Sequence, residues 1–260
     1  FHSFTRPSEI KGTAYQFRDC AFSHFAGGVL TFFGGSRARS TASGHLVAGC
    51  TFRDFQHLKQ TTYPAIWPRE CGVAVRDCRF EDAAHNAIRL IGNDHFVGWC
   101  QFENVLRETL DCGAAYAGRN TSYLGNLFLG CSFKNTKPVA ETNLSLSDTR
   151  AAAVYLDDGV WGGDIVGCDV DSARCGFFIR GGNFHRVMWN QISDCAVGLS
   201  LDRCVAKYDA IMDHFSASDW NSASTDNWFM SYYFGRNASA SGSLDWNHPL
   251  WRAAYPSLKE

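Results

Sequence analysis

A short pattern recurs along most of the chain: an apolar residue, two others, a cysteine, one more residue and a second apolar residue. Its copies are Phe17/Cys20/Phe22, Val47/Cys50/Phe52, Val75/Cys78/Phe80, Val97/Cys100/Phe102, Phe128/Cys131/Phe133 and Ile165/Cys168/Val170. A seventh copy, Val187/Asn190/Ile192, has asparagine in place of the cysteine. The shortest spacing between copies is 22 residues, as from Cys78 to Cys100. Repeats of this length build solenoids, and this one suits a coil of a parallel β-helix.

The apolar residues of each copy alternate within a strand and slip by one at the cysteine, as a chain does when it turns between two β-faces. Equivalent positions of successive coils then lie ~4.8 Å apart. The cysteines would form an internal column, in which Asn190 stacks its amide as in an asparagine ladder. We therefore predict an all-β fold, a parallel β-helix of about seven coils over residues 1–205.

The last segment, residues 206–260, loses the repeat and gains many aromatic residues. Because the end of a solenoid has to be covered, we predict a second unit here, a cap or lid packed on the β-helix. Helix is expected over 206–215 and near 249–258, so the cap is predicted to be partly helical.

Composition excludes several classes of partner. The chain has 45% apolar and 19% charged residues and a net charge of −2, without a run of lysine or arginine. We therefore expect no nucleic-acid partner and no membrane surface, and no stretch reaches the 18 or so apolar residues of a membrane span. We expect a monomer. Because the chain begins at Phe1 rather than methionine, we expect a processed or excised piece.

The eleven cysteines favour neither zinc nor a complete disulfide framework. No C-x-x-C pair is present, so no metal site is predicted. The six cysteines of the repeat are interpreted as small buried apolar residues. The remaining ones, which an odd total prevents from all pairing, leave disulfides open for Cys71, Cys112, Cys175, Cys195 and Cys204.

Localisation rests on three Asn-x-Ser/Thr triplets, at Asn120, Asn143 and Asn237. Such triplets are compatible with N-glycosylation. No signal peptide is visible at the beginning of the chain. The expected location is secreted or extracellular.

A second strand follows each corner, and aligning these strands brings charged residues together. Their inward pairs are Ile88/Leu90, Ala115/Ala117, Val154/Leu156, Phe177/Ile179 and Leu199/Leu201. The residue after each pair lies at one common height, so three neighbouring coils present Asp157, Arg180 and Asp202 in a row on the outer surface. Two residues earlier in each strand are Tyr116, Tyr155, Phe178 and Ser200. We expect both rows to face solvent and to line a sugar-binding cleft.

A surface salt-bridge ladder is the alternative interpretation of the charged row, and such a ladder would contribute little to stability. Long insertions favour the cleft. Residues 103–113 and 135–150 both lengthen coils on the approach to this strand. Long loops that gather over one face of a repeat array usually mark its binding face.

The segments LDCGAAYAGR, AVYLDDG, GFFIRGGN and VGLSLDR, in this order and spacing, resemble right-handed parallel β-helix proteins of the pectin-lyase-like superfamily. Within it they are most similar to the proteins grouped around glycoside hydrolase family 141. The resemblance covers about residues 85–205 and extends to the tail HPLWRAAYPSLKE. Family members usually have more coils and an asparagine at the corner where this chain has cysteine.

The resemblance implies an enzyme that cleaves a glycan of plant or algal type. By motif match it assigns catalytic carboxylates to Asp157, Asp158 and Asp202. Substrate contacts are expected from the residues around them: Asp111, Tyr116, Arg119, Tyr155, Trp161, Phe178 and Arg180. No cofactor is expected for a hydrolase.

Spacing favours an inverting hydrolase. Asp157 and Asp202 lie two coils apart, so their Cα atoms should be ~9.6 Å apart, and inverting glycosidases hold their carboxyls ~6.5–9.5 Å apart. A cation such as Arg180 beside both carboxylates suits a base better than a general acid. The adjacent pair Asp157/Asp158 should hold one proton longer than a single carboxylate. The acid is therefore expected to be Asp157 or Asp158, and the base Asp202.

Two alternatives remain. A polysaccharide lyase on the same fold would hold calcium with Asp157, Asp158 and Asp202, and Arg180 or Arg119 would take the proton. A non-catalytic β-helix would bind glycans without cleaving them, since a fold does not fix a function.

Overall fold

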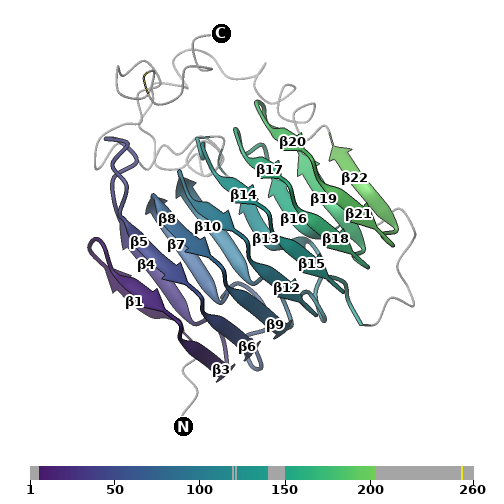
Figure 1. Ribbon diagram of the computed structural model, residues 1–260, viewed down its shortest axis with the longest axis horizontal. Coiled ribbons are helices and arrows are strands. Elements are labelled where there is room, and N and C mark those ends of the chain that lie inside the picture. The colour runs from purple at the N-terminus through teal and green to yellow at the C-terminus, as the bar shows by residue number, and fades with distance from the viewer. Residues whose placement is uncertain (1–5, 119, 121, 140–149, 203–252, 254–260) are drawn as a thin grey trace, which may run out of the picture.

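The protein is an all-β parallel β-helix in the computed structural model, which describes residues 6–118, 120, 122–139, 150–202 and 253. The chain runs in turn through three parallel sheets, so that each coil adds one strand to each sheet. The sheets wind side by side along the whole stack (Figure 1). Seven complete coils and one further strand are described, which confirms the prediction of about seven coils.

The first sheet has eight strands and the other two have seven each. The first contains β1 (Ser8–Lys11), β4 (Leu30–Gly34), β7 (Ile66–Cys71), β10 (Ile88–Asn93), β13 (Cys112–Gly118), β16 (Ala151–Asp157), β19 (Cys175–Arg180) and β22 (Val197–Asp202). The second contains β2 (Gln16–Arg18), β5 (His45–Ala48), β8 (Val73–Arg76), β11 (Phe96–Gly98), β14 (Leu127–Leu129), β17 (Asp164–Val166) and β20 (Arg186–Met188). The third contains β3 (Ala21–Phe25), β6 (Thr51–Phe55), β9 (Arg79–Ala83), β12 (Gln101–Glu103), β15 (Ser132–Lys134), β18 (Asp169–Asp171) and β21 (Gln191–Ser193).

A column of phenylalanine rings fills the interior beside the third sheet. In-register pairing puts the apolar residue that follows each cysteine directly above its counterpart in the preceding coil. Adjacent rings lie 4.6–5.1 Å apart between centroids, with interplanar angles of 8–14°. The members of the column are Phe22, Phe52, Phe80, Phe102 and Phe133. Stacked rings at one height of the first five coils fix their register, and Val170 and Ile192 continue the column in the last two coils.

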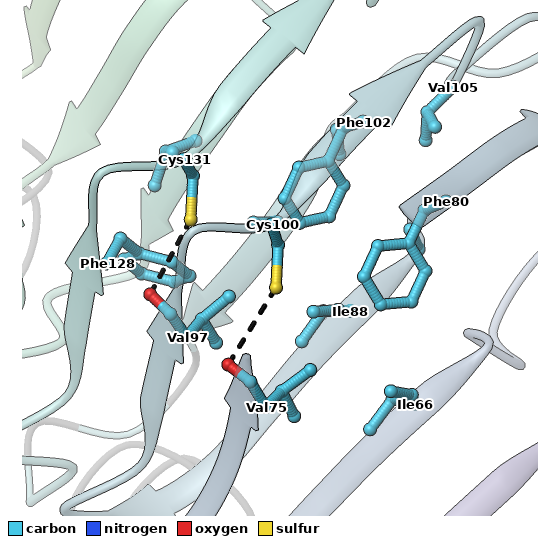
Figure 2. Packing of buried hydrophobic residues seen from close by; sticks show 14 of the residues in the cluster. Ile66, Val75, Phe80, Ile88, Val97, Cys100, Phe102, Val105, Phe128 and Cys131 are labelled. Atoms are coloured by element: carbon cyan, nitrogen blue, oxygen red, sulfur yellow. Dashed lines mark hydrogen bonds between the residues drawn. The ribbon is translucent and has the colours of Figure 1, made fainter. Parts of the chain in front are cut away.

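The predicted internal cysteine column is present at the corner between the second and third sheets. Each thiol lies 3.1–3.6 Å from the carbonyl oxygen two residues before it. From the second coil on, it also lies 3.6–3.9 Å from a carbonyl oxygen of the preceding coil. Figure 2 shows two such contacts, from Cys100 to Val75 and from Cys131 to Val97. The thiol thus acts as a weak donor that joins one coil to the next.

Asn190 takes the same place in the seventh coil. Its Nδ2 donates to the oxygen of Ile165 at 3.0 Å, the carbonyl equivalent to those that the thiols contact. Its Oδ1 also accepts from the backbone N–H of Cys168 at 2.7 Å. The corner therefore needs a short side chain that can donate, and both residue types satisfy it.

None of the ten cysteines in the described part of the chain forms a disulfide. This includes Cys71, Cys112, Cys175 and Cys195, for which the sequence left pairing open, whereas Cys204 lies outside the described residues. The predicted cap, residues 206–260, also lies outside them apart from Ala253. Within the described ranges, no helix is long and apolar enough to cross a membrane.

Removing one ring from the phenylalanine column should destabilise the fold strongly. We expect Phe102→Ala to lower the free energy of unfolding by about 3–5 kcal/mol, because it leaves a cavity between two stacked rings. Chemical denaturation followed by circular dichroism measures the change. Leu58→Ala is the control, since Leu58 is 71% exposed, and its loss should change the free energy by less than about 0.5 kcal/mol. Equal losses in the two variants would contradict the internal column.

The buried thiols should resist alkylation. Burial raises the pKa of Cys71, Cys112 and Cys175 to about 12, so at pH 8 these thiols are protonated, and only the thiolate reacts. We expect iodoacetamide to label the half-buried Cys20 and Cys195 first and Cys71, Cys112 and Cys175 only after urea unfolding. Peptide mass spectrometry measures the order of labelling. Fast native labelling of Cys112 would be inconsistent with this packing.

Candidate functional site

The charged row predicted on the first sheet is present in the expected register. Gly118 pairs with Asp157 across β13 and β16, and Arg180 pairs with Asp202 across β19 and β22. Leu156 pairs with Ile179, which places Asp157 beside Arg180 on neighbouring strands. The three charged residues therefore lie at one height on three consecutive strands.

Arg180 joins the three carboxylates. Its Nη1 lies 3.6 Å from Oδ1 of Asp157 and 3.4 Å from Oδ1 of Asp158, and its Nε lies 3.4 Å from Oδ2 of Asp202. The side chain of Asp202 is 50% exposed, whereas that of Asp158 is 12% exposed. The guanidinium thus separates one exposed carboxylate from two covered ones.

Asp157 is fixed from two further sides. The hydroxyl of Tyr116 donates to its Oδ2 at 2.7 Å, and the backbone N–H of Asp158 donates to its Oδ1 at 2.8 Å. Asp158 has a φ of 45° and Gly159 a φ of 74°, so the chain turns sharply directly after the strand. Asparagine, aspartate and glycine adopt this left-handed conformation at the lowest cost. The Asp-Asp-Gly sequence therefore ends β16 and aims two successive carboxylates at Arg180.

The expectation that these rows face solvent is wrong for the aromatic residues and for Asp157. Both rows do point away from the interior, because their neighbours Val154 and Leu156 belong to the central core. Yet Asp157 is only 3% exposed. The aromatic residues of the strip are also buried: Tyr116, Tyr155 and Phe178.

The aromatic residues are buried because they form a second small hydrophobic cluster on the outer side of the sheet, together with Ala152 and Cys175. The ring of Tyr155 lies 5.6 Å from that of Tyr116, edge to face, and is stacked 4.5 Å from that of Phe178. Burial, and in smaller part the charges of Asp157 and Asp111, raise the pKa of Tyr155. Tyr155 is thus a protonated packing residue rather than an open sugar platform.

The other predicted site residues are placed less closely. Asp111 precedes β13 with a φ of 60° and is exposed, and its charge acts on Tyr155. Trp161 is half-buried in the turn after Asp158 and packs edge to face with Phe184 at 6.0 Å. Arg119 and the loop residues 140–149 lie outside the described residues. The structure therefore brings together Asp157, Asp158, Arg180, Asp202 and Tyr116.

Sequence reasoning missed the continuation of the outer row on β7 and β10. Arg89 lies with its Cζ 5.5 Å from the ring centroids of both Trp67 and Tyr116. Arg69 lies 5.1 Å from the Trp67 ring. The signal was available, because residues 65–71 (AIWPREC) and 87–93 (AIRLIGN) are copies of the same strand, and aligning the first of them would have placed Trp67 and Arg69 in the outer rows.

A cysteine–histidine pair lies beside this face. The Sγ of Cys112 is 3.1 Å from Nδ1 of His85, which is also 2.8 Å from the hydroxyl of Thr109. Burial raises the pKa of Cys112 to about 12 and, with a smaller contribution from Arg89, lowers that of His85 to about 4. Both groups are neutral near pH 7, so the pair lacks the thiolate that a cysteine nucleophile needs.

Asn120 is a poor glycosylation acceptor in the folded protein. It is 6% exposed, and its Oδ1 accepts hydrogen bonds from the backbone N–H and the hydroxyl of Ser122. Asn143 and Asn237 lie outside the described residues. Secretion therefore stays a prediction.

Comparisons with models of known families, with curated proteins and with solved structures found no significant match. The parallel β-helix is shown by the strand arrangement itself. The more specific resemblance to glycoside hydrolase family 141 rests on the sequence motifs alone.

The two ends of the charged row should differ in their contribution to stability. We expect Asp157→Asn to lower the free energy of unfolding by about 1–3 kcal/mol, because Asp157 is buried and bonded to Tyr116 and to a backbone N–H. Asp202→Asn should lower it by less than about 1 kcal/mol, because an exposed ion pair contributes little. Urea denaturation of both variants measures the difference. A larger loss for Asp202→Asn would contradict the burial of Asp157.

Proposed function

We propose that the protein is a carbohydrate-active enzyme that hydrolyses a glycosidic bond in a polysaccharide. The observation that carries the proposal is the pair of carboxylates, Asp158 and Asp202, on either side of the Arg180 guanidinium at one height of a β-helix face. Glycoside hydrolysis usually requires two carboxyl groups that flank the bond to be cut.

The strand geometry favours inversion of the anomeric centre. Asp158 directly follows β16 and Asp202 ends β22, and β19 lies between these strands, so equivalent Cα atoms of the two strands are ~9.6 Å apart. This agrees with the ~6.5–9.5 Å carboxyl separation of inverting enzymes better than with the ~5–5.5 Å of retaining enzymes.

Exposure suggests the division of roles. Asp202 is half exposed, so it can reach a water molecule and act as the base. Asp158, at the turn and mostly covered, would protonate the leaving oxygen. Asp157 is a positioning residue in this proposal, because its oxygens already accept from Tyr116 and from the Asp158 N–H. Arg180 would hold both reacting carboxylates and donate to sugar hydroxyls.

A calcium-dependent lyase fits the described residues less well. Calcium prefers six to eight oxygen ligands around one point, whereas here the Arg180 guanidinium lies between the carboxylates. Across the described ranges, no three or more His, Cys, Asp or Glu side chains are placed to hold a metal ion. We therefore derive no step through calcium.

A non-catalytic glycan-binding β-helix is the second candidate. The observation that favours it is the closed network in which one arginine already contacts all three carboxylates. Such a network suits a structural role as well as a catalytic one.

Turnover on a panel of plant and algal polysaccharides tests the proposal. We expect Asp158→Asn and Asp202→Asn each to lower kcat by about 10²–10⁴-fold, the usual loss when a general acid or base is removed. Asp169→Asn, an exposed aspartate on the third sheet, is the matched control and should retain full activity. The measurements are release of reducing ends and nuclear magnetic resonance of the first anomer formed.

Three outcomes would contradict the proposal. An unsaturated product with new ultraviolet absorbance that a chelator abolishes would identify a lyase. Glycan binding that survives in both variants, with no turnover in any form of the protein, would identify a non-catalytic module. Full activity in both variants would place the reaction elsewhere.

A further inference from the structure

The outer face of the first sheet continues from the carboxylates toward β10, β7 and β4 with a different character. Thr31, Trp67 and Arg89 point outward, because residues next to them in each strand, such as Leu30, Ile66 and Ile88, belong to the central core. Thr31 pairs with Trp67, and Ile66 pairs with Ile88, which places Arg89 beside Trp67.

Arginine and aromatic side chains alternate here. Arg89 lies between the rings of Trp67 and Tyr116, 5.5 Å from each centroid. Arg69 lies 5.1 Å from the centroid of the Trp67 ring and 5.2 Å from that of Phe33. Cation–π contacts help to hold each guanidinium in place. The exposed acid Glu9 is paired with Lys11 at 2.8 Å, which lowers the pKa of Glu9. The charge of Arg69 makes a smaller contribution in the same direction.

Two polar atoms in this row have no partner within the part of the chain that the structure describes. They are the hydroxyl of Thr31, a residue that is only 3% exposed, and the indole Nε1 of Trp67. A buried polar group without a hydrogen bond costs free energy, so each instance needs an explanation. A bound ligand that accepts hydrogen bonds would satisfy both.

The side chains of this row offer hydrogen-bond donors and positive charge. Guanidinium groups and the indole N–H donate only, and the planar fork of arginine matches carboxylate and sulfate oxygens. Burial raises the pKa of the nearby Tyr123, the charges of Arg37, Arg69 and Arg89 act in the opposite direction, and that of Glu70 raises it. Three positive charges and one negative charge therefore act at this end of the sheet. The neighbouring end carries Asp157, Asp158 and Asp202 around Arg180, so the two ends differ in the sign of their net charge.

The row is also continuous with the carboxylates. Arg89 contacts the ring of Tyr116, and the hydroxyl of Tyr116 donates to Asp157. On the basis of the proposed function, we infer that Trp67, Arg69 and Arg89 form a subsite that binds a negatively charged substituent of the glycan, a carboxylate or a sulfate ester. This substituent belongs to a sugar next to the bond that is cut.

Calorimetric titration of the full chain tests the inference with paired probes. One pair is an oligogalacturonate and the same oligomer with its carboxyls reduced to alcohols. The other pair is a sulfated galactan oligosaccharide and its desulfated form. We expect the charged member of one pair to bind at least about tenfold more tightly than its neutral counterpart, which corresponds to a charge-assisted hydrogen bond or more. The pair that shows the preference identifies the anion.

Variants test which residues cause the preference for the charged probe. Arg89→Gln and Arg69→Gln should each reduce it about tenfold, and Arg89→Lys should restore part of it because lysine keeps the charge but loses the fork. Arg79→Gln is the control, since Arg79 is an exposed arginine on the third sheet. Thermal unfolding checks that each variant is folded. Failure of both charged probes to bind more tightly than their neutral counterparts, or a full preference in Arg89→Gln and Arg69→Gln, overturns the subsite.

Failure of the subsite and failure of the proposed function give different results. A protein that prefers the charged probe but cleaves no glycan keeps the subsite and loses the hydrolase. A protein that cleaves charged and neutral glycans equally well, with and without Arg89, keeps the hydrolase and loses the subsite.

Discussion

In-register stacking of successive coils is the constraint on which everything else in this molecule depends. Parallel hydrogen bonding repeats each position at the strand spacing, so a side chain at one height always meets its counterpart in the next coil. Inside, this produces the phenylalanine column and the cysteine column. Outside, the same register places Asp157, Arg180 and Asp202 within ion-pair distance although they are far apart in sequence.

The corners make this stacking possible. The residue before each corner cysteine or asparagine has a positive φ, between 51° and 65° in all seven coils. A second column lies at the carboxyl end of the third sheet, with φ between 50° and 61°: His24, Asp54, Asp82, Asn104, Asn135, Ser172 and Asp194. Short polar side chains tolerate the left-handed conformation best, and Asn104 donates to Asp82 of the coil before it at 3.1 Å. Each coil is thus held by two tight turns that leave loop length free to vary elsewhere.

Much of this was predictable because the repeat carries it. The spacing of the cysteines gave the parallel β-helix and the coil number, and the alternation in residues 153–159 gave the register of the charged row. What could not be predicted is the environment of the outer face. Periodicity tells which way Tyr155 points but not whether another group covers it, and Tyr155 is buried by its neighbours Tyr116 and Phe178. The column after the third sheet was missed because its members share a backbone conformation rather than a residue type.

The position of the carboxylates along the stack has a consequence for the stability of the proposed site. Among the residues that the structure describes, Asp202 lies on the last strand of the first sheet, β22, which pairs there with β19 alone. Its inward neighbours Leu199 and Leu201 are 46% and 70% exposed, so the described residues make few apolar contacts with this strand. Terminal units of a solenoid fray before the middle opens. Mild heating or denaturant would therefore separate Asp202 from Arg180 while the preceding coils stay folded. The proposed site would then be lost at a lower temperature than the fold.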